Sequence, residues 1–378
     1  MRPASFHIME DKMNKLCNDI IAATEFPLPV KKDYKIGCLG SGFIMADCQL
    51  EAYRQNGFCV KGIASRTYEN ARKTAERYGI PQVYESMDAL IDDPELEIID
   101  IGLPPHIQVE LVKKICARGT VKGILCQKPV ALNTAQAKDL LELAEKAGIV
   151  IAVNQNMRYD QSVRALKYAM EQGYIGTPVV ASIDMRAQSE IQKFYEAYGR
   201  FEILDMAIHH LDVFRYLFGT PQKLAAFCRQ DPKEKCKHRD GISQIVYQYE
   251  DGLLATILDD KFTGPDKPAA RDRYIEWRVE GTKGIAIGRI GWPDFPEISP
   301  STFRMASTEL PGTWIAPSWE KAWFPHAFSG PMAELMIALE NGREPVNSLR
   351  DNLDTMRCVD ACYLSLDEER TIHLEEMQ

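Results

Sequence analysis

Two polar residues near the middle of the chain have the types and spacing of an acid–base pair. Asp205 and His209 lie four residues apart in LDMAIHHLD (204–212), whose apolar residues recur with helical spacing. Side chains four apart on a helix share a face, with Cβ atoms about 5–6 Å apart. A histidine titrates near neutral pH and can take a hydroxyl proton as hydride leaves the adjoining carbon. Asp205 would then orient the His209 ring or contact the substrate.

The same helix face also allows two other interpretations. Asp212 lies three residues beyond His209, so the three side chains suit a solvated surface or a structural polar cluster equally well. A zinc site would need further ligands of fixed geometry. Cys228, Cys236 and His238 form no recognisable pattern with this face, and we expect no metal.

A lysine follows a short apolar segment in CQKP (126–129). Residues 123–126 are expected to form a strand, and ligands of a doubly wound sheet bind beyond the carboxyl ends of its strands. Lys128 at that edge can hydrogen-bond a substrate hydroxyl and stabilise its alkoxide, while Gln127 and Lys128 can both contact a cofactor. The alternative for Lys128 alone is an ordinary surface lysine.

A glycine-containing turn near the start of the chain favours dinucleotide binding. GSGFIMA (40–46) follows the first expected strand and opens the first expected helix. Gly40 permits a tight turn, Gly42 lets a pyrophosphate approach the backbone, and the helix N-terminus at Phe43 and Ile44 supplies N–H groups. The third small residue, Ala46, comes one position later than in the general fingerprint. A turn required only for packing is the alternative.

The residues after the second expected strand bear on the choice between NAD and NADP. A carboxylate there would bind the ribose 2′-hydroxyl and repel a 2′-phosphate. This chain has Ser65 and Arg66 and no acid until Glu69. A serine hydroxyl and a guanidinium suit a phosphate, so NADP is favoured over NAD. After the third expected strand, Pro104 and His106 form an edge that can back a nicotinamide ring.

These residues require a sheet that places them together. Short apolar segments alternate with helical periodicity from residue 34 to about 155, which is typical of a parallel sheet with helices on both faces. The expected strands are 35–39, 60–64, 98–102, 123–126 and 150–154. The expected helices are 46–55, 70–78, 108–117 and 134–147.

After residue 155 several strands follow one another without helices between them. The expected strands are 179–185, 223–229, 243–249, 253–259, 274–280 and 284–290, with helices at 162–172, 203–218, 332–340 and 352–365. This order predicts a second, α+β domain with a mostly antiparallel sheet. We therefore expect an N-terminal extension (1–33) carrying a helix at 9–23, a dinucleotide-binding Rossmann domain (34–155), and a substrate-binding and oligomerisation domain (156–378).

Length and composition agree with a two-domain soluble protein. The chain has 378 residues, 45% apolar and 26% charged, with a formal net charge of −9. An acidic chain without a basic stripe is not expected to bind nucleic acid or an anionic membrane. We expect a cytoplasmic protein, because no segment is apolar enough to span a bilayer and the ten cysteines are scattered rather than arranged as a disulfide framework.

Taken together, these segments resemble the Gfo/Idh/MocA oxidoreductase family, which includes glucose–fructose oxidoreductase and myo-inositol dehydrogenase. The matching segments are GSGFIMA (40–46), GLPPH (102–106), QKP (127–129), NQNMRYD (154–160) and LDMAIHHLDVFRYLFG (204–219). The resemblance covers about residues 34–378. It implies a Rossmann domain followed by an α/β domain with a large open sheet, through which members commonly pair, so a homodimer or homotetramer is expected.

The resemblance also implies roles for particular residues. The catalytic lysine of the family corresponds to Lys128, and its Asp-x-x-x-His pair to Asp205 and His209. The substrate would be a sugar, cyclitol or related polyol, oxidised or reduced at a hydroxyl-bearing carbon by NADP or NAD. One departure is Gln127, where the family usually has glutamate; the amide keeps the size and loses the charge.

The assignment of the pocket residues leaves alternatives open. Arg158 and Tyr159, just past the fifth expected strand, can bind substrate hydroxyls or act as a hinge. Some relatives cleave a glycosidic bond after a transient oxidation, and tightly retained NAD without net turnover would indicate that reaction. A non-catalytic regulator that binds dinucleotide is the third possibility, which Lys128, Asp205 and His209 argue against.

Overall fold

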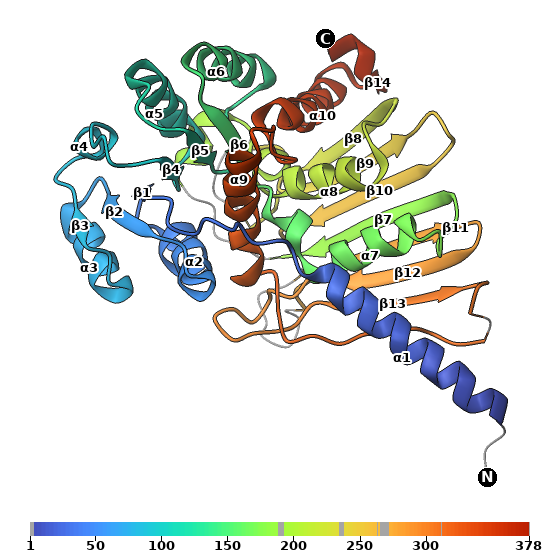
Figure 1. Cartoon of the computed structure of the whole chain (residues 1–378). Helices are drawn as coiled ribbons and strands as arrows, with labels where there is room; N and C mark the ends of the chain where they lie inside the picture. The colour runs from blue at the N-terminus through green and yellow to red at the C-terminus, as the bar shows by residue number, and fades with distance from the viewer. Residues whose placement is uncertain are drawn as a thin grey trace. The chain divides into compact units, whose positions relative to one another are not determined.

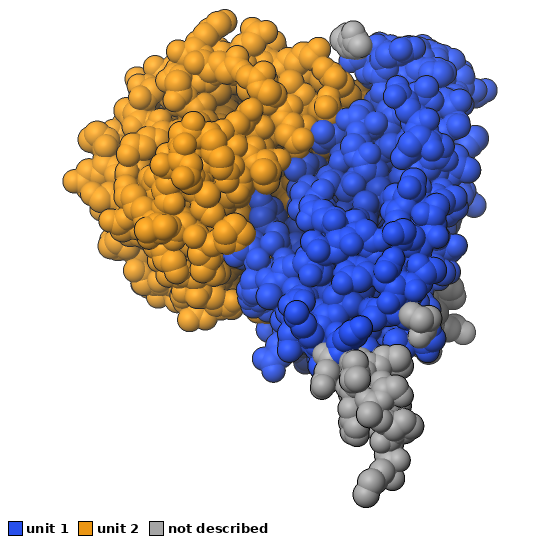
Figure 2. All heavy atoms as spheres, turned by 45° about the vertical axis from the view of Figure 1, so that its right-hand side comes forward, with its two compact units in different colours: residues 1–26, 157–324, 361–378 blue, residues 27–156, 325–360 orange. Residues whose placement is uncertain are grey.

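The computed structural model describes residues 4–187, 193–233, 238–262, 264, 272–310 and 312–377. The chain forms two compact units, shown in different colours in Figure 2. Residues 27–156 and 325–360 form the parallel-sheet unit. Residues 1–26, 157–324 and 361–378 form the antiparallel-sheet unit.

The parallel-sheet unit is built on six strands in the order β3-β2-β1-β4-β5-β6, all paired in parallel (Figure 1). Every residue of β1, β4 and β5 is buried, because helices cover both faces of the sheet. The strands are β1 (Ile36–Leu39), β2 (Val60–Ala64), β3 (Gln82–Val83), β4 (Ile98–Ile101), β5 (Gly123–Cys126) and β6 (Val150–Val153). This order is that of a doubly wound dinucleotide-binding sheet.

Most helices of this unit alternate with its strands in sequence. They are α2 (Leu50–Asn56), α3 (Tyr68–Tyr78), α4 (Met87–Ile91), α5 (Pro105–Arg118), α6 (Thr134–Ala147) and α9 (Ser329–Asn341). Helix α6 has the predicted bounds because its ends carry strong signals. The side chain of Asn133 accepts a hydrogen bond from the backbone N–H of Gln136 at the N-terminus, and Gly148 adopts the left-handed conformation at the C-terminus.

Helix α9 packs against β5 and β6 although it comes from much later in the chain. A Cβ atom at Gly123 of β5 would lie 3.2 Å from the side chains of Leu335 and Leu339 on α9. The glycine therefore allows the helix to approach the strand closely.

The antiparallel-sheet unit holds eight strands in the order β13-β12-β11-β7-β10-β9-β8-β14. All neighbours pair antiparallel except β7 and β10, which run parallel. The strands are β7 (Pro178–Arg186), β8 (Lys223–Arg229), β9 (Ile242–Gln248), β10 (Leu254–Asp260), β11 (Tyr274–Gly281), β12 (Gly284–Arg289), β13 (Thr302–Ser307) and β14 (Ile372–His373).

The two faces of this second sheet differ in exposure. Along β7, β9, β10 and β11, buried residues alternate with exposed or half-buried ones. The buried face packs in part against α7 (Gln161–Glu171), and the π-helical turn η4 (Ile203–Ala207) leads into α8 (Ile208–Phe218). The opposite face carries the exposed side chains of Val180, Phe227 and Leu254.

The N-terminal helix α1 (Ala4–Thr24) packs along α7. Its C-terminus is held by the guanidinium of Arg164, which donates hydrogen bonds to the carbonyl oxygens of Ala23, Thr24 and Glu25. These bonds satisfy carbonyl groups that a helix end leaves without partners. The helix predicted for residues 9–23 is thus present and begins earlier.

The predicted fold class is confirmed: a doubly wound parallel sheet and a second, mostly antiparallel sheet. Strand β13, whose residues Phe303 and Met305 face the core, was not among the expected strands. Helix α10 (Leu349–Glu368) extends the predicted C-terminal helix at both ends. No helix in the described part of the chain is long and apolar enough to cross a membrane.

Candidate active site

The glycine turn lies directly after β1, as predicted. Gly40 has φ +112°, and a Cβ atom there would lie 2.7 Å from the carbonyl oxygen of Gly102, which follows β4. Both the conformation and the space therefore require glycine. A Cβ atom at Gly42 would meet no protein atom within 4 Å, so the fold itself does not require glycine there. The open space at Gly42 suits a bound group that approaches the backbone.

The helix after this turn begins with a π-helical turn, η1 (Ile44–Gln49), and continues as α2. Phe43 precedes it and is half exposed. The fully buried carboxyl group of Asp100 on β4 anchors this helix, accepting hydrogen bonds from the Gln49 amide (2.8 and 2.9 Å) and the Tyr53 hydroxyl (2.7 Å). Burial raises the pKa of Asp100 to about 7, although both bonds act in the opposite direction.

The end of β2 carries the two residues predicted to select the cofactor. Ser65 accepts a hydrogen bond from the hydroxyl of Ser41 in the glycine turn at 2.9 Å. Arg66 is exposed. The nearest acid in the sequence, Glu69, is paired with Arg72 within α3 at 2.7 Å. No carboxylate thus follows β2 directly, and the side chain of Glu69 is already engaged.

The turn carrying Gln127 and Lys128 is held from α5 by Gln108, a fully buried residue. Its Oε1 accepts from the Gln127 backbone N–H at 2.7 Å, and its Nε2 donates to the carbonyl oxygens of Gln127, Pro129 and Val130 at 2.8–3.2 Å. The sequence analysis did not identify Gln108. Its only signal in the sequence is that it is a polar residue on a helix face that is otherwise apolar. Lys128, which follows Gln127, is half buried.

Gln127 is buried, with 9% of its surface exposed. Its side-chain amide nitrogen lacks a hydrogen-bond partner among the described residues. Its Oε1 accepts from the backbone N–H of Lys128 at 2.9 Å, which fixes the orientation of the amide. Its Nε2 has no hydrogen-bond partner among the described residues. A buried donor without a partner is costly, so this N–H is suited to a bound group.

Pro104 and His106 lie where helix α5 begins. Pro104 caps the helix through its carbonyl oxygen, which accepts from the backbone N–H groups of Ile107 and Gln108. His106 is exposed and lines a shallow pocket of about 160 Å³ with Val109 and with Gln136 of α6. The open space at Gly42 and the unsatisfied amide of Gln127 together fit a dinucleotide bound along this unit.

In the antiparallel-sheet unit, Asp205 and His209 lie on one continuous helical segment formed by η4 and α8. Asp205 falls within the π-helical turn, whereas His209 belongs to the α-helix. Such π turns are frequent at functional sites. The His209 ring is buried and meets the edge of Trp323, with ring centroids 5.2 Å apart and planes at 87°. The indole thus holds the ring in place.

The Asp205 carboxylate is bound by two side chains that the sequence analysis did not identify. The Tyr195 hydroxyl donates to Oδ1 at 2.6 Å, and Lys261 Nζ donates to Oδ2 at 3.0 Å. Tyr195 precedes the helix and Lys261 follows β10 directly, so sequence spacing does not connect them with Asp205. About a quarter of the Asp205 side chain stays exposed, whereas Lys261 is 5% exposed.

Arg158 and Asp212 form a buried ion pair. The Arg158 Nε and Nη2 atoms lie 2.5 and 2.6 Å from the two carboxylate oxygens of Asp212, and both side chains are less than 5% exposed. This bidentate geometry assigns Asp212 a structural partner. Tyr159 is also buried and meets the ring of Phe26 edge-on at 5.7 Å. The substrate roles predicted for Arg158 and Tyr159 stay predictions, and their burial favours a structural role.

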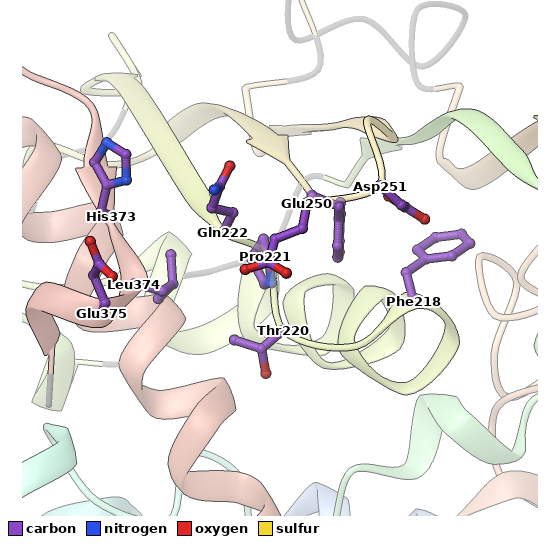
Figure 3. Close-up of a pocket in the computed structure, with 10 residues that line it drawn as sticks. Phe218, Thr220, Pro221, Gln222, Glu250, Asp251, His373, Leu374 and Glu375 are labelled. Carbon is purple, nitrogen blue, oxygen red and sulfur yellow. The ribbon is translucent and has the colours of Figure 1, made fainter.

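Other features bear on what this unit binds. The described residues contain no group of three or more His, Cys, Asp or Glu side chains able to hold a metal ion. Cys236, considered above as a ligand, lies outside them. Figure 3 shows a pocket of about 380 Å³ lined by Phe218, Glu250, Asp251 and His373. It contains none of the residues predicted to bind cofactor or substrate.

Segments of both units match models of known protein families. Residues 34–155 match the family model described as "oxidoreductase family, NAD-binding Rossmann fold", and residues 163–287 match that of the "GFO/IDH/MocA C-terminal domain". The chain belongs to the Gfo/Idh/MocA family. It is therefore an oxidoreductase that uses a nicotinamide dinucleotide, as the glycine turn and the family resemblance predicted.

Individual members of the Gfo/Idh/MocA family align over different lengths. D-apiose dehydrogenase of Paraburkholderia graminis is 27% identical, over 92% of this chain and 91% of its own. Myo-inositol 2-dehydrogenase of Thermotoga maritima is 31% identical, over 40% of this chain and 45% of its own. An Agrobacterium radiobacter oxidoreductase, solved with NAD⁺, L-tartaric acid and magnesium, has a TM-score of 0.76 at 23% identity and covers 92% of this chain and 100% of its own.

Proposed function

We propose that this oxidoreductase transfers hydride between its dinucleotide and a hydroxyl-bearing carbon of a sugar, cyclitol or related polyol. The relatives named for D-apiose and myo-inositol act on compounds of this kind, and the first of them aligns over nearly the whole chain. The observation that carries the proposal is the presence of Asp205 and His209 on one helical segment, with a carboxylate that is ordered by two donors and still partly exposed.

The residues of the parallel-sheet unit are suited to hold the cofactor. Gly40 makes the tight turn, Gly42 leaves the backbone accessible to a pyrophosphate, and the N-terminus of the helix at Phe43 and Ile44 supplies favourable dipole potential. Gln127 offers its unsatisfied Nε2–H to an acceptor on the bound group. When bound, the nicotinamide accepts or donates the hydride.

The remaining chemistry is proton transfer by side chains of this chain. In the oxidation direction Lys128 hydrogen-bonds the reacting hydroxyl and lowers the cost of its alkoxide. His209 takes the hydroxyl proton as general base, and it returns the proton in the reduction direction. Asp205 accepts a hydrogen bond from a neighbouring substrate hydroxyl. This role is favoured over orienting His209 because Tyr195 and Lys261 already fix the carboxylate from other elements.

Substitution of His209 tests the proposal. We expect His209→Gln to lower kcat by about 10²–10⁴-fold, the usual contribution of general acid–base catalysis, and to leave dinucleotide binding unchanged. The matched control is His373→Gln, which lies in the pocket of Figure 3 away from the predicted residues. Full turnover by His209→Gln would contradict the assignment. A parent protein that binds dinucleotide and turns over no polyol would instead indicate a regulator.

NADP is proposed as the preferred cofactor. Ser65 and the exposed Arg66 follow β2 without a carboxylate, and Glu69 is paired with Arg72. A 2′-phosphate would meet a hydroxyl and a guanidinium there. Titrations of NADPH and NADH followed by intrinsic fluorescence test this choice. Tighter binding of NADPH, reversed in Ser65→Asp, is expected; tighter binding of NADH by the parent would refute it.

We also propose that the chain pairs through the outer face of the antiparallel sheet, as a homodimer or homotetramer. That face carries Val180, Phe227 and Leu254, which are 45%, 67% and 49% exposed. Exposed apolar groups gathered on one sheet face are typical of an interface.

A further inference from the structure

A buried lysine, Lys261, binds the carboxylate of Asp205, the acid of the proposed acid–base pair. Lys261 follows the last residue of β10, and its side chain is 5% exposed. Its Nζ donates to Asp205 Oδ2 at 3.0 Å and lies 4.2 Å from the centroid of the Phe201 ring. A lysine is almost never buried to this degree unless its charge is compensated. Asp205 supplies that compensation.

The opposite oxygen of the same carboxylate is bound by a buried tyrosine. Tyr195 is 6% exposed and donates from its hydroxyl to Asp205 Oδ1 at 2.6 Å. Its ring packs edge-on against Phe201, with centroids 5.2 Å apart. The two donors come from different elements, so they fix the carboxylate in orientation as well as in charge. About a quarter of the Asp205 side chain is exposed.

The Lys261 charge also acts on a group of buried acids. Glu202 is fully buried and accepts from the Ser243 hydroxyl at 2.7 Å. Burial and the charges of Asp259 and Asp240 raise the pKa of Glu202 well above its usual range, and the Lys261 charge acts in the opposite direction. Tyr195 contacts Asp205 directly, Glu202 feels the charges of Lys261, Asp259 and Asp240, and His210 Nδ1 lies 2.8 Å from Asp259.

We propose that Lys261 is a positioning residue of the oxidoreductase site: with Tyr195 it holds the Asp205 carboxylate ionised and oriented to accept a hydrogen bond from a substrate hydroxyl. This inference rests on the proposed function of Asp205. It assigns the lysine no contact with substrate. The neighbouring Lys261 cation favours the ionised form of the carboxylate, which is the form that accepts hydrogen bonds at both oxygens.

Substituting Asp205 alone cannot test this role cleanly, since it leaves the Lys261 charge buried without its partner and threatens the fold. Lys261→Met is the better variant, because methionine is apolar and close in length. Lys261→Arg restores the cation and serves as the rescue. Lys167→Met is the matched control, since Lys167 is half buried and donates to the backbone carbonyl of Tyr216.

The pH dependence of kcat/KM gives the first readout, because it reports ionisations of the unliganded site. For carbonyl reduction, in which His209 must be protonated and does not set the acid limb, we expect the acid limb of Lys261→Met, where activity falls with decreasing pH, to move upward by about 1–3 pH units, since Asp205 loses its cation. Lys261→Arg and Lys167→Met should keep the acid limb of the parent. A role confined to stability would lower the melting temperature of Lys261→Met and leave the limb in place, which would overturn the inference.

A second readout needs neither cofactor nor substrate. Carbon-13 labelling of aspartate carboxyl groups, with the Asp205 resonance assigned from its loss in Asp205→Asn/Lys261→Met, follows ionisation of Asp205 directly. The inference predicts that this carboxyl titrates at higher pH in Lys261→Met than in the parent. Equal titration would overturn it. If the parent turned over no polyol, the proposed function would fail while this titration would still decide the ion-pair effect.

Discussion

Single residues of the site differ in whether the fold or the bound group requires them. Gly40 is required by the fold, because its φ of +112° and the nearby Gly102 carbonyl leave no room for a side chain. Gly42 has open space around it, and the Gln127 Nε2 has no partner among the described residues. Substitutions of Gly42 and Gln127 therefore report on cofactor binding with little disturbance of the fold.

We predict that Gly42→Ala abolishes or strongly weakens dinucleotide binding while the melting temperature changes by only a few degrees. The added methyl group meets no protein atom and occupies the space into which the pyrophosphate would fit. Fluorescence titration with NADPH and thermal unfolding measure the two quantities. Unchanged affinity in Gly42→Ala would show that the glycine turn is not the pyrophosphate site.

We predict that Gln127→Met raises the dissociation constant of the dinucleotide about tenfold, because the bound acceptor loses its donor. The Lys128 backbone N–H also loses its acceptor, so the free energy of unfolding should fall by about 1 kcal/mol. Gln82→Met, at an exposed position on β3, is the control. An equal affinity in both variants would place the Gln127 amide away from the cofactor.

At the scale of elements, helix η1–α2 depends on one buried acid. Asp100 on β4 accepts from Gln49 and Tyr53, which lie on successive turns of that helix. Burial raises its pKa to about 7 in the folded protein, compared with 3.8 for an ordinary aspartate. Folding therefore favours the protonated form of Asp100, and its stability contribution is present below about pH 4 and lost as pH rises to about 7.

We predict that Asp100→Asn makes the melting temperature less dependent on pH between about pH 4 and pH 7. The parent should lose stability relative to this variant across that range, because only in the parent does unfolding expose a carboxyl group that then ionises. Thermal unfolding at a series of pH values measures the difference, with Glu142→Gln on the exposed face of α6 as control. A difference that stays constant from pH 4 to pH 7 would contradict the assignment.

The elements that sequence patterns predicted best are those with signals at both ends. Helix α6 has its predicted bounds because Asn133 and Gly148 cap it, and β5 is delimited by Gly123 and the following turn. Strand β13 was missed because prolines interrupt the preceding segment at 293, 296 and 300. The π-helical turns at Ile44–Gln49 and Ile203–Ala207 were missed because apolar spacing alone predicts an ordinary helix.

The candidate site was predictable to the extent that its residues share a local segment. Asp205 and His209 were found from their spacing on one helix. Tyr195 and Lys261 were missed because only the folded chain brings their separate elements to the carboxylate. The pairing of Arg158 with Asp212 was missed for the same reason, since 54 residues separate them.

At the scale of the whole molecule, the second sheet offers a surface that a single chain leaves uncovered. Leu254 on β10 pairs in register with Val180 on β7, and the two side chains are 49% and 45% exposed. Charged residues such as Arg186 and Asp260 follow on the same face and pair with each other at 3.2 Å. A mixed apolar and charged surface of this kind is typical of an interface between copies.

We predict that Leu254→Glu shifts the protein from dimer or tetramer to monomer in size-exclusion chromatography with light scattering. The substitution places a charge among apolar contacts of the proposed interface. Ile298→Glu is the matched control, since Ile298 is 50% exposed and lies outside the sheet. An unchanged mass for Leu254→Glu would place the oligomer contact elsewhere.

The most direct test of the central claim is the near-ultraviolet absorbance of reduced nicotinamide when dinucleotide-loaded protein is mixed with a panel of sugars and polyols. We predict that at least one compound is oxidised with formation of NADPH or NADH by the parent, and that Lys128→Met and His209→Gln lose this reaction while still binding dinucleotide. Binding of dinucleotide without oxidation of any compound, or with equal rates in the two variants, would contradict the proposed site.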